Sequence, residues 1–416
     1  MLKYFISVTE NLIVPAVLLG MLTAYVRSVY GSRGIRILTA GAIIGFIGAA
    51  VMSYLKNKTR LINTTDWNFR IFTLFIGAYL LFLLFDLPLI RKKTGGERGV
   101  IVPVLSALLA GAMLVYSLPD VLAYPYTFVL GGQAVFSTGF IYRFIGMILG
   151  LLLVILSAFA VNYTARRLNA GTVGLLLKLA LLVTAIQYAS KIAQTLITRR
   201  IISNHTLFLV VKYTSNHSYL FIFGVLAAAA VIPVALWIMS FFVNEPYRNP
   251  AEHRKILAKW RSSRRWSTVV ILCFILAVLN ITVIKAYANR PVELSPTEEC
   301  EVRDDKVYVP LEQVDDGHLH RFDYETPNKV KVRFIVIKKP NSSAYGVGLD
   351  ACDICGETGY FERNGQIVCK LCDVVMNINT IGFKGGCNPK VIDYSIKDGY
   401  IIVPTYTLIE HEKDFK

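Results

Sequence analysis

The sequence predicts a polytopic α-helical membrane bundle of about eight spans, followed by a small β-rich domain that carries cysteine knuckles. Two observations predict this fold class. Hydrophobic residues make up 54% of the 416 residues and the mean hydropathy is +0.51, which is above the range of ordinary soluble proteins. Five of the seven cysteines lie between Cys352 and Cys387. We therefore expect a membrane domain at residues 1–290, a linker at 291–306 and an extracytoplasmic metal-binding domain at 307–416.

The first 290 residues contain eight stretches that could each cross a bilayer, since a spanning helix needs about 20 predominantly apolar residues. The first stretch is too long and too weakly flanked to be only a cleaved signal peptide, and a second stretch follows at once. The predicted spans are residues 6–26, 37–55, 69–90, 100–122, 140–162, 171–193, 218–242 and 267–288.

Charge divides the chain at the same point. Residues 1–290 carry 29 Lys and Arg against 7 Asp and Glu, whereas residues 291–416 carry 15 against 21. The basic residues lie in short segments between the spans, so they indicate orientation in a lipid bilayer, and we expect no nucleic-acid partner. The richest segment, 248–265, precedes the last span. If this segment is cytoplasmic, the C-terminal domain lies on the outer face.

The region after residue 290 has the pattern of a β-rich domain. The apolar residues Val330, Val332, Phe334 and Val336 alternate with Lys329, Lys331 and Arg333, which is typical of a half-buried strand. Residues 315–317 and 397–399 are Asp-Gly turn signals between apolar runs. Prolines and an acidic cluster in residues 291–306 indicate a linker.

The cysteines are the strongest chemical signal in the chain. Cys352 and Cys355 form one C-x-x-C pair, Cys369 and Cys372 form a second pair after thirteen residues, and Cys387 follows alone. In each such turn two thiolates converge on one point while backbone N–H groups point at the sulfurs. Two turns together offer four soft ligands for Zn²⁺ or iron, and the spacing alone favours zinc. Disulfide exchange in an oxidising compartment is the third interpretation.

Other polar residues are secondary candidates. Lys178 lies in a predicted span, where a charge is costly, so we expect a partner such as Asp86. This pair is either part of a quinone, proton or ion site or a structural ion pair, and we favour the structural interpretation. His318 and His320 alternate, so both could face one side of a strand and complete an iron site, although surface histidines are commoner.

The residues around the cysteines resemble the FtrD-like membrane iron–sulfur proteins. The resemblance covers about residues 305–405 and is carried by Cys352-Asp-Ile-Cys355-Gly, Val368-Cys369-Lys-Leu-Cys372 and Gly385-Gly386-Cys387-Asn388-Pro389. It implies an iron–sulfur cluster or iron at these cysteines in preference to zinc. It also implies an electron-transfer accessory of a bacterial iron uptake system rather than a stand-alone enzyme. The implied partners are an iron permease and periplasmic iron-binding or redox proteins. From the predicted topology we expect the protein in the bacterial inner membrane, with this domain in the periplasm.

A short segment of the membrane half is similar to the first helix of Ftr-type iron permeases. Those permeases use an R-E-x-x-E arrangement, in which two carboxylates one helical turn apart offer oxygen ligands to Fe³⁺. Glu10 matches this pattern, but Thr9 stands in place of the Arg and Ile13 in place of the second Glu. Few other acids lie near membrane depth. We therefore expect a related bundle that has lost the transport ligands.

Overall fold

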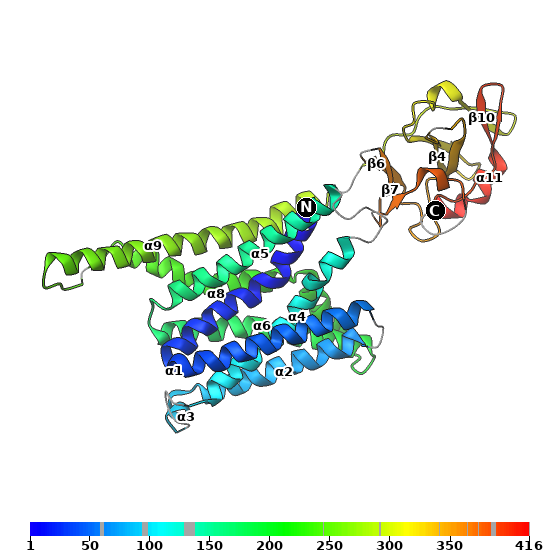
Figure 1. Ribbon diagram of the computed structural model, residues 1–416. Coiled ribbons are helices and arrows are strands. Elements are labelled where there is room, and N and C mark those ends of the chain that lie inside the picture. The colour runs from blue at the N-terminus through cyan, green and yellow to red at the C-terminus, as the bar shows by residue number, and fades with distance from the viewer. Residues whose placement is uncertain are drawn as a thin grey trace. The chain divides into compact units, whose positions relative to one another are not determined.

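The computed structural model describes residues 1–58, 62–93, 99–128, 138–243, 245–290, 293–340, 342–363, 365–372, 374–383 and 388–415. The chain divides into two compact units, Met1–Asn289 and Arg290–Lys416. The first unit consists of helices, and the second is built mainly from short strands (Figure 1).

The described part of the first unit has seven helices that are long and apolar enough to cross a membrane. This confirms the predicted helical membrane bundle, with a count of seven rather than eight. The seven are α1 (Leu2–Lys58), α2 (Thr64–Phe85), α4 (Ile101–Phe128), α5 (Thr138–Ala165), α6 (Ala170–Thr198), α8 (Tyr219–Met239) and α9 (Pro250–Leu279). Helix α9 continues through a π-helical turn, Asn280–Ile284, into α10 (Lys285–Ala288), and α3 (Pro88–Lys93) and α7 (His205–Asn216) are short.

The count differs from the prediction because the first two predicted spans belong to one helix, α1, which is broken at Gly31. The backbone of Gly31 has φ +60° and ψ −150°, a conformation that glycine adopts without a steric penalty. Figure 1 shows the two halves of α1 running in opposite directions from this break. Two apolar stretches with a short basic segment between them do not reveal whether a loop or a single non-helical residue joins them.

The second half of α1 packs closely against α4 through small residues. A Cβ atom added to Gly41 would lie 2.4 Å from the Cβ of Ala107, and one added to Gly45 would lie 2.7 Å from the Cα of Gly111. Small side chains let helix backbones approach closely, which matters in lipid because apolar burial does not drive helices together there. The glycines thus fix the line along which these two helices touch.

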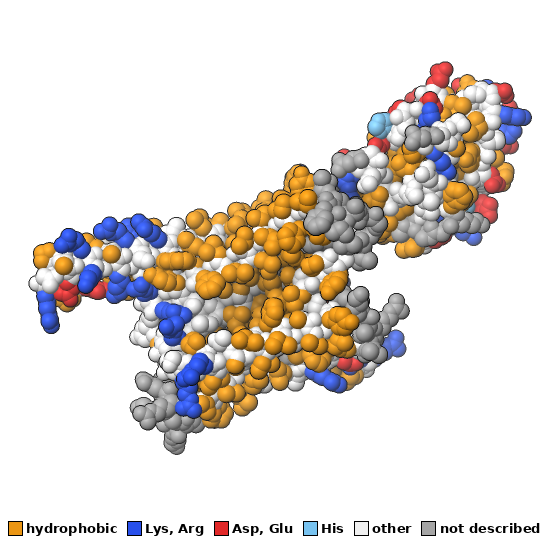
Figure 2. Space-filling model, in the orientation of Figure 1, with side chains coloured by type: hydrophobic (Ala, Val, Ile, Leu, Met, Phe, Trp, Pro, Cys, Tyr) orange, Lys and Arg blue, Asp and Glu red, His pale blue; other side chains and the backbone are white. Residues whose placement is uncertain are grey.

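The basic segment expected before the last span is helical. Helix α9 begins at Pro250, and the side chain of Asn249 caps it by accepting a hydrogen bond from the N–H of Glu252. No further proline or glycine interrupts residues 251–279, so the helix continues from the basic segment into the apolar span. Figure 2 shows Lys and Arg side chains gathered on one end of α9 and apolar side chains over the helices beyond it.

The described residues of the second unit form three antiparallel sheets, which confirms the predicted β-rich domain. The four-stranded sheet has the order β1 (Glu301–Arg303), β2 (Lys306–Pro310), β10 (Tyr400–Pro404) and β9 (Ser395–Lys397). The other two sheets are β3 (His320–Glu325), β4 (Lys331–Lys338) and β5 (Tyr345–Leu349), and β6 (Tyr360–Arg363), β7 (Gln366–Cys369) and β8 (Val375–Met376). Helix α11 (Thr405–Glu410) follows β10.

Strand β4 joins the two hydrophobic clusters of this unit. Val332, Phe334 and Val336 belong to the main core, together with valines of β2 and β10. Ile335 and Ile337, on the opposite face, belong to a second cluster that includes buried cysteines. The predicted alternation is therefore present. The second face is only partly basic, because its last two side chains, Ile335 and Ile337, are apolar and pack in the cluster of the buried cysteines.

The turn and linker predictions have different outcomes. In the β9–β10 hairpin, Asp398 and Gly399 have φ values of +53° and +81°, as an Asp-Gly hairpin turn requires. The segment expected as a linker contains β1, which pairs with β2. The N–H of Glu298 also donates to the carbonyl of Arg321 at 2.7 Å. Much of that segment is therefore integrated into the second unit.

Candidate metal centre

The two C-x-x-C turns lie beside the second hydrophobic cluster. Cys352 and Cys355 are in the turn between β5 and β6, Cys369 ends β7, and Cys372 lies in the turn before β8. The Sγ atoms of Cys355, Cys369 and Cys372 all lie within 4.8 Å of one another. Across the described ranges, no other three His, Cys, Asp or Glu ligand atoms converge in this way.

The first turn places Cys352 next to this group. The N–H of Gly356 donates to the carbonyl of Cys352 at 3.0 Å, and Gly356 has a φ of +65°, which closes the turn. The N–H of Cys355 donates to the Sγ of Cys352 at 3.1 Å. The hydroxyl of Tyr360 also hydrogen-bonds this sulfur. The thiol of Cys352 is therefore fixed beside the other three, and its sulfur accepts two hydrogen bonds.

The second turn has the same character. The backbone N–H groups of Leu371 and Cys372 donate to the sulfur of Cys369. The N–H of Cys369 donates to the carbonyl of Val374 at 3.0 Å, which closes the turn. The N–H of Lys370 donates to the carbonyl of Gly359 at 3.0 Å and so links the second turn to the first.

The surroundings of the thiols fit a bound metal ion. Cys352, Cys355 and Cys369 are buried, whereas Cys372 is exposed. Burial raises the pKa of the Cys355 thiol, and hydrogen bonds with the thiols of Cys372 and Cys369 raise it further. Burial also raises the pKa of Cys369. Without a cation these crowded thiols retain their protons. A metal ion that binds thiolates would displace those protons.

A buried ion pair that the sequence analysis missed supports the first turn. Asp350 and Arg321 are 0% and 1% exposed, and the Nε of Arg321 donates to the Oδ2 of Asp350 at 2.8 Å. Asp350 also accepts from the Nε of Arg333 at 3.2 Å and from the N–H of Tyr360 at 2.8 Å. The remaining donors of Arg321 reach Ser295 and the carbonyl of Tyr360. This network fixes both ends of the segment that carries the first cysteine pair.

Gly359 is required where this network meets the turn. Its φ is +80°, and a Cβ atom at this position would lie 2.8 Å from the Oδ2 of Asp350 and 2.7 Å from Leu294. Only a residue without a side chain lets the backbone pass so close to the carboxylate.

The two histidines do not join the thiols. The Nδ1 of His318 lies 3.1 Å from Glu362, and this hydrogen bond raises the pKa of His318. His320 lies between two carboxylates, with Nδ1 2.9 Å from Glu298 and Nε2 2.8 Å from Asp316. Their role as additional metal ligands stays a prediction without support from this geometry.

Two further cysteines of the C-terminal unit are Cys387 and Cys300. Cys387, the fifth predicted ligand, lies outside the described residues. Burial and the nearby carboxylate of Asp323 raise the pKa of Cys300 to about 11. Cys300 therefore stays a protonated thiol at neutral pH, and thiols of this kind are poor nucleophiles.

The predicted polar residues of the membrane unit form separate pairs. The Nζ of Lys178 lies 2.7 Å from the Oδ2 of Asp86, and the hydroxyl of Tyr25 donates to Asp86 at 2.6 Å. Glu10 instead accepts from the Nζ of Lys285 at 2.6 Å. Tyr25 and Glu10 are on the same helix, about 22 Å apart along its axis. The structure therefore pairs Asp86 with Lys178, as expected, but does not bring Glu10 to the same site.

The residues that replace the permease pattern are both buried in the bundle. The hydroxyl of Thr9 donates to the carbonyl of Phe5 and accepts from the Nδ2 of Asn280 at 2.7 Å. Ile13 belongs to the hydrophobic core. The similarity to iron permeases stays a prediction, because none of the comparisons with known proteins extends to this unit.

Comparisons with known proteins place the second unit. No curated protein and no solved structure matches the chain. Residues 314–415 match the model of the family described as "Membrane iron-sulfur containing protein FtrD-like", which confirms the resemblance for the C-terminal domain.

Proposed function

We propose that the protein is a membrane-anchored iron-binding or iron–sulfur redox protein that serves as an electron-transfer accessory of a bacterial iron uptake system. The observation that carries this proposal is the convergence of Cys355, Cys369 and Cys372 in a domain that matches an iron–sulfur family. Cys352 is the fourth proposed ligand, and Cys387 is the further candidate.

The chain's own residues suit electron transfer at this site. Iron held by thiolates supplies one-electron chemistry, and hydrogen bonds to the sulfurs together with solvent exposure set its potential. Backbone N–H groups donate to the sulfurs of Cys352 and Cys369. Cys372 is exposed at the surface, which gives a redox partner access to one edge of the site.

Two exposed apolar side chains form a small surface beside that edge. Ile354 and Leu371, the third residues of the two C-x-x-C turns, are 68% and 64% exposed. Large apolar side chains at turn tips are suited to a small and short-lived contact with another redox protein. We propose that periplasmic iron-binding or redox proteins, and an iron permease, are the partners of this surface.

A structural zinc site is the second candidate function. Four thiolates also satisfy Zn²⁺, which would fasten the two turns together without redox chemistry. Thiol–disulfide exchange is less well supported. All six described cysteines are free thiols, and burial raises the pKa of the Cys355 and Cys369 thiols, which disfavours the thiolate that attacks a disulfide.

Anaerobic purification of the full chain, with metal analysis and a visible absorption spectrum, separates these functions. Iron with thiolate-to-iron charge-transfer bands supports the proposal, one colourless zinc ion supports the scaffold, and a metal-free chain without free thiols supports disulfide exchange. Serine at Cys352, Cys355, Cys369 or Cys372 should remove or alter the bands. Cys273→Ser is the matched control, because Cys273 is buried in α9 of the membrane unit.

We further propose that the protein lies in the bacterial inner membrane with its C-terminal domain in the periplasm. The break in α1, helix α3 and the start of α9 lie at one end of the bundle (Figure 1). The sequence near these points is rich in Lys and Arg, which favours a cytoplasmic location for this end. Helix α9 leads from this end to the opposite one, where the chain leaves the membrane unit.

A further inference from the structure

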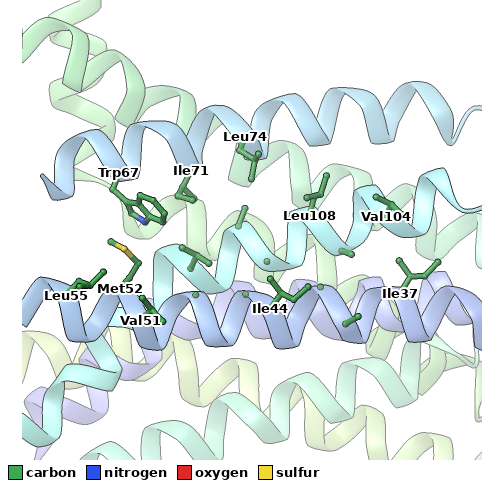
Figure 3. A pocket seen from close by; sticks show the side chains of 18 of the residues that line it. Ile37, Ile44, Val51, Met52, Leu55, Trp67, Ile71, Leu74, Val104 and Leu108 are labelled. Atoms are coloured by element: carbon green, nitrogen blue, oxygen red, sulfur yellow. The ribbon is translucent and has the colours of Figure 1, made fainter. Parts of the chain in front are cut away.

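An apolar groove runs along the second half of α1, between α2 and α4. Figure 3 looks into this groove, which has a volume of about 780 Å³ and extends from Ile37 to Leu55 on α1. Eighteen residues of helix separate these two side chains, about 27 Å, which is close to the thickness of a bilayer's hydrocarbon core of about 30 Å. Gly41, Gly45 and Gly111 line the groove where α1 and α4 touch, and they add no side chains to it.

The Leu55 end of the groove adjoins a small polar cavity of about 100 Å³. Met52, Trp67 and Val115 line both the groove and this cavity. Lys56 and Asp120 also line the cavity and form an ion pair with each other. The two described charges of the cavity therefore neutralise one another, and its other described polar groups are uncharged.

One of these groups is a buried donor without an acceptor. The indole N–H of Trp67 is buried and has no hydrogen-bond partner among the described residues. Figure 3 shows the ring of Trp67 beside Met52 at the end of the groove. A buried N–H without an acceptor costs free energy, because no hydrogen bond compensates for its removal from water. The site therefore presents a donor for which the described protein residues supply no acceptor.

We propose that this groove and cavity bind an isoprenoid quinone, with the prenyl tail along the groove and the ring at the polar end. A quinone has an uncharged head, and one of its carbonyl oxygens would accept the hydrogen bond of Trp67. Its tail is apolar and long enough to follow the groove through the membrane. This inference concerns the membrane unit alone and does not depend on which metal the second unit holds.

A phospholipid fits the same features less well. Its head carries a phosphate, whereas the only described cation of the cavity, Lys56, is already paired with Asp120. An acyl chain of one leaflet also covers only about half of the hydrocarbon thickness that the groove follows. Both differences favour the quinone.

Lipid extraction and ligand retention on the purified full chain test the proposal. Extracts of the wild-type protein should contain about one quinone per chain, and quinone-depleted protein should retain added decyl-ubiquinone through gel filtration. Leu108→Trp, which fills the groove from α4, should reduce retention at least tenfold. Leu81→Trp is the matched control, because Leu81 is similarly exposed (46% against 43%) but does not line the groove.

Trp67→Phe keeps the aromatic ring and removes only the N–H donor, so it also tests the site if Leu108→Trp does not fold. We expect a three- to tenfold loss of decyl-ubiquinone affinity, about the value of one hydrogen bond. Extracts with phospholipid but no quinone would overturn the proposal. Equal retention by wild type, Leu108→Trp and Trp67→Phe would also overturn it. Metal content, measured on the same samples, reports separately on the proposed function.

Discussion

At the scale of single residues, the candidate metal centre depends on a buried charge that is not one of the proposed ligands. Asp350 holds Arg321, Arg333 and the N–H of Tyr360, and it immediately precedes the first cysteine turn. Breaking a buried ion pair by removing one partner typically costs about 3–5 kcal/mol, because the other charge is left uncompensated. The position of the first two thiols therefore depends on the fold around Asp350 as much as on the turn itself.

We predict that Asp350→Ala lowers the free energy of unfolding of the C-terminal domain by about 3–5 kcal/mol and accelerates metal loss. Denaturant titration of the full chain, followed by the metal-dependent absorption, measures both effects. Asp323→Ala is the control, because Asp323 makes a long ion pair (3.6 Å) with the exposed Lys331. Such pairs contribute only about 0–1 kcal/mol. Equal losses in the two variants would contradict the supporting role of Asp350.

The hydroxyl of Tyr360 leads to a second prediction for a redox-active iron site. It hydrogen-bonds the sulfur of Cys352, and such a bond stabilises the reduced form, in which the sulfur carries more negative charge. Tyr360→Phe should lower the reduction potential by about 20–60 mV, since one hydrogen bond contributes about 0.5–1.5 kcal/mol and 59 mV corresponds to a tenfold change for one electron. Anaerobic redox titration measures the shift at unchanged iron content. An unchanged reduction potential would show that the Tyr360 hydroxyl does not influence the redox site.

At this scale, sequence reasoning anticipated the convergence of Cys355, Cys369 and Cys372 but not the residues that support them. The spacing of a C-x-x-C pair is a local property, so the convergence within each turn follows from the sequence. Arg321 and Asp350 are separated by 29 residues, and their contact depends on how β3 and β5 pack on β4. An arginine in the predicted β-rich region and an aspartate before a cysteine turn were the available signals, but no spacing rule connects them.

At the scale of elements, a glycine at the α1–α4 contact and a glycine in α2 have different structural roles. A Cβ atom at Gly45 would lie 2.7 Å from the backbone of α4, whereas one at Gly77 of α2 would meet nothing within 4 Å. Adding a methyl group at the first position therefore separates two helices. Adding it at the second removes only the flexibility of glycine in a helix.

We predict opposite effects for these two substitutions. Gly45→Ala should destabilise the membrane unit by about 1–3 kcal/mol, the usual cost of overpacking. Gly77→Ala should leave it unchanged or stabilise it by up to about 1 kcal/mol, because alanine favours helix more than glycine does. Thermal unfolding in detergent, followed by tryptophan fluorescence, compares the two variants. A lower melting temperature for Gly77→Ala than for Gly45→Ala would contradict the close α1–α4 contact.

Element boundaries were less predictable than element types. Apolar length predicted each membrane helix, because hydrocarbon requires the backbone to satisfy its own hydrogen bonds. The break in α1 rests on the backbone conformation of Gly31 alone, and the same short segment holds a second glycine, Gly34, that stays helical. The helical start of α9 was also missed, because a charged segment without apolar periodicity is equally typical of a loop.

At the scale of the whole molecule, the chain divides into two compact units, and the functions proposed for them are unequally supported. The family match covers residues 314–415, so the interpretation of the second unit rests on both geometry and similarity. The membrane unit has only its own chemistry as evidence. Its paired charges, Asp86 with Lys178 and Glu10 with Lys285, are satisfied internally, which favours structural roles for them.

The orientation of the whole chain gives the last prediction. Basic residues remain on the cytoplasmic side because their translocation across the inner membrane is unfavourable, and the first turns of α9 carry the densest basic segment. One further apolar stretch, the rest of α9, separates this segment from the C-terminal domain.

A green fluorescent protein fused after Phe242 should therefore fluoresce, and alkaline phosphatase fused after the last residue should be active. The exchanged fusions should both be inactive, because the first reporter folds poorly in the periplasm and the second requires disulfides that form there. Activity of the same reporter at both positions would place the two points on one side of the membrane. The metal centre would then face the cytoplasm, where it would not meet periplasmic partners.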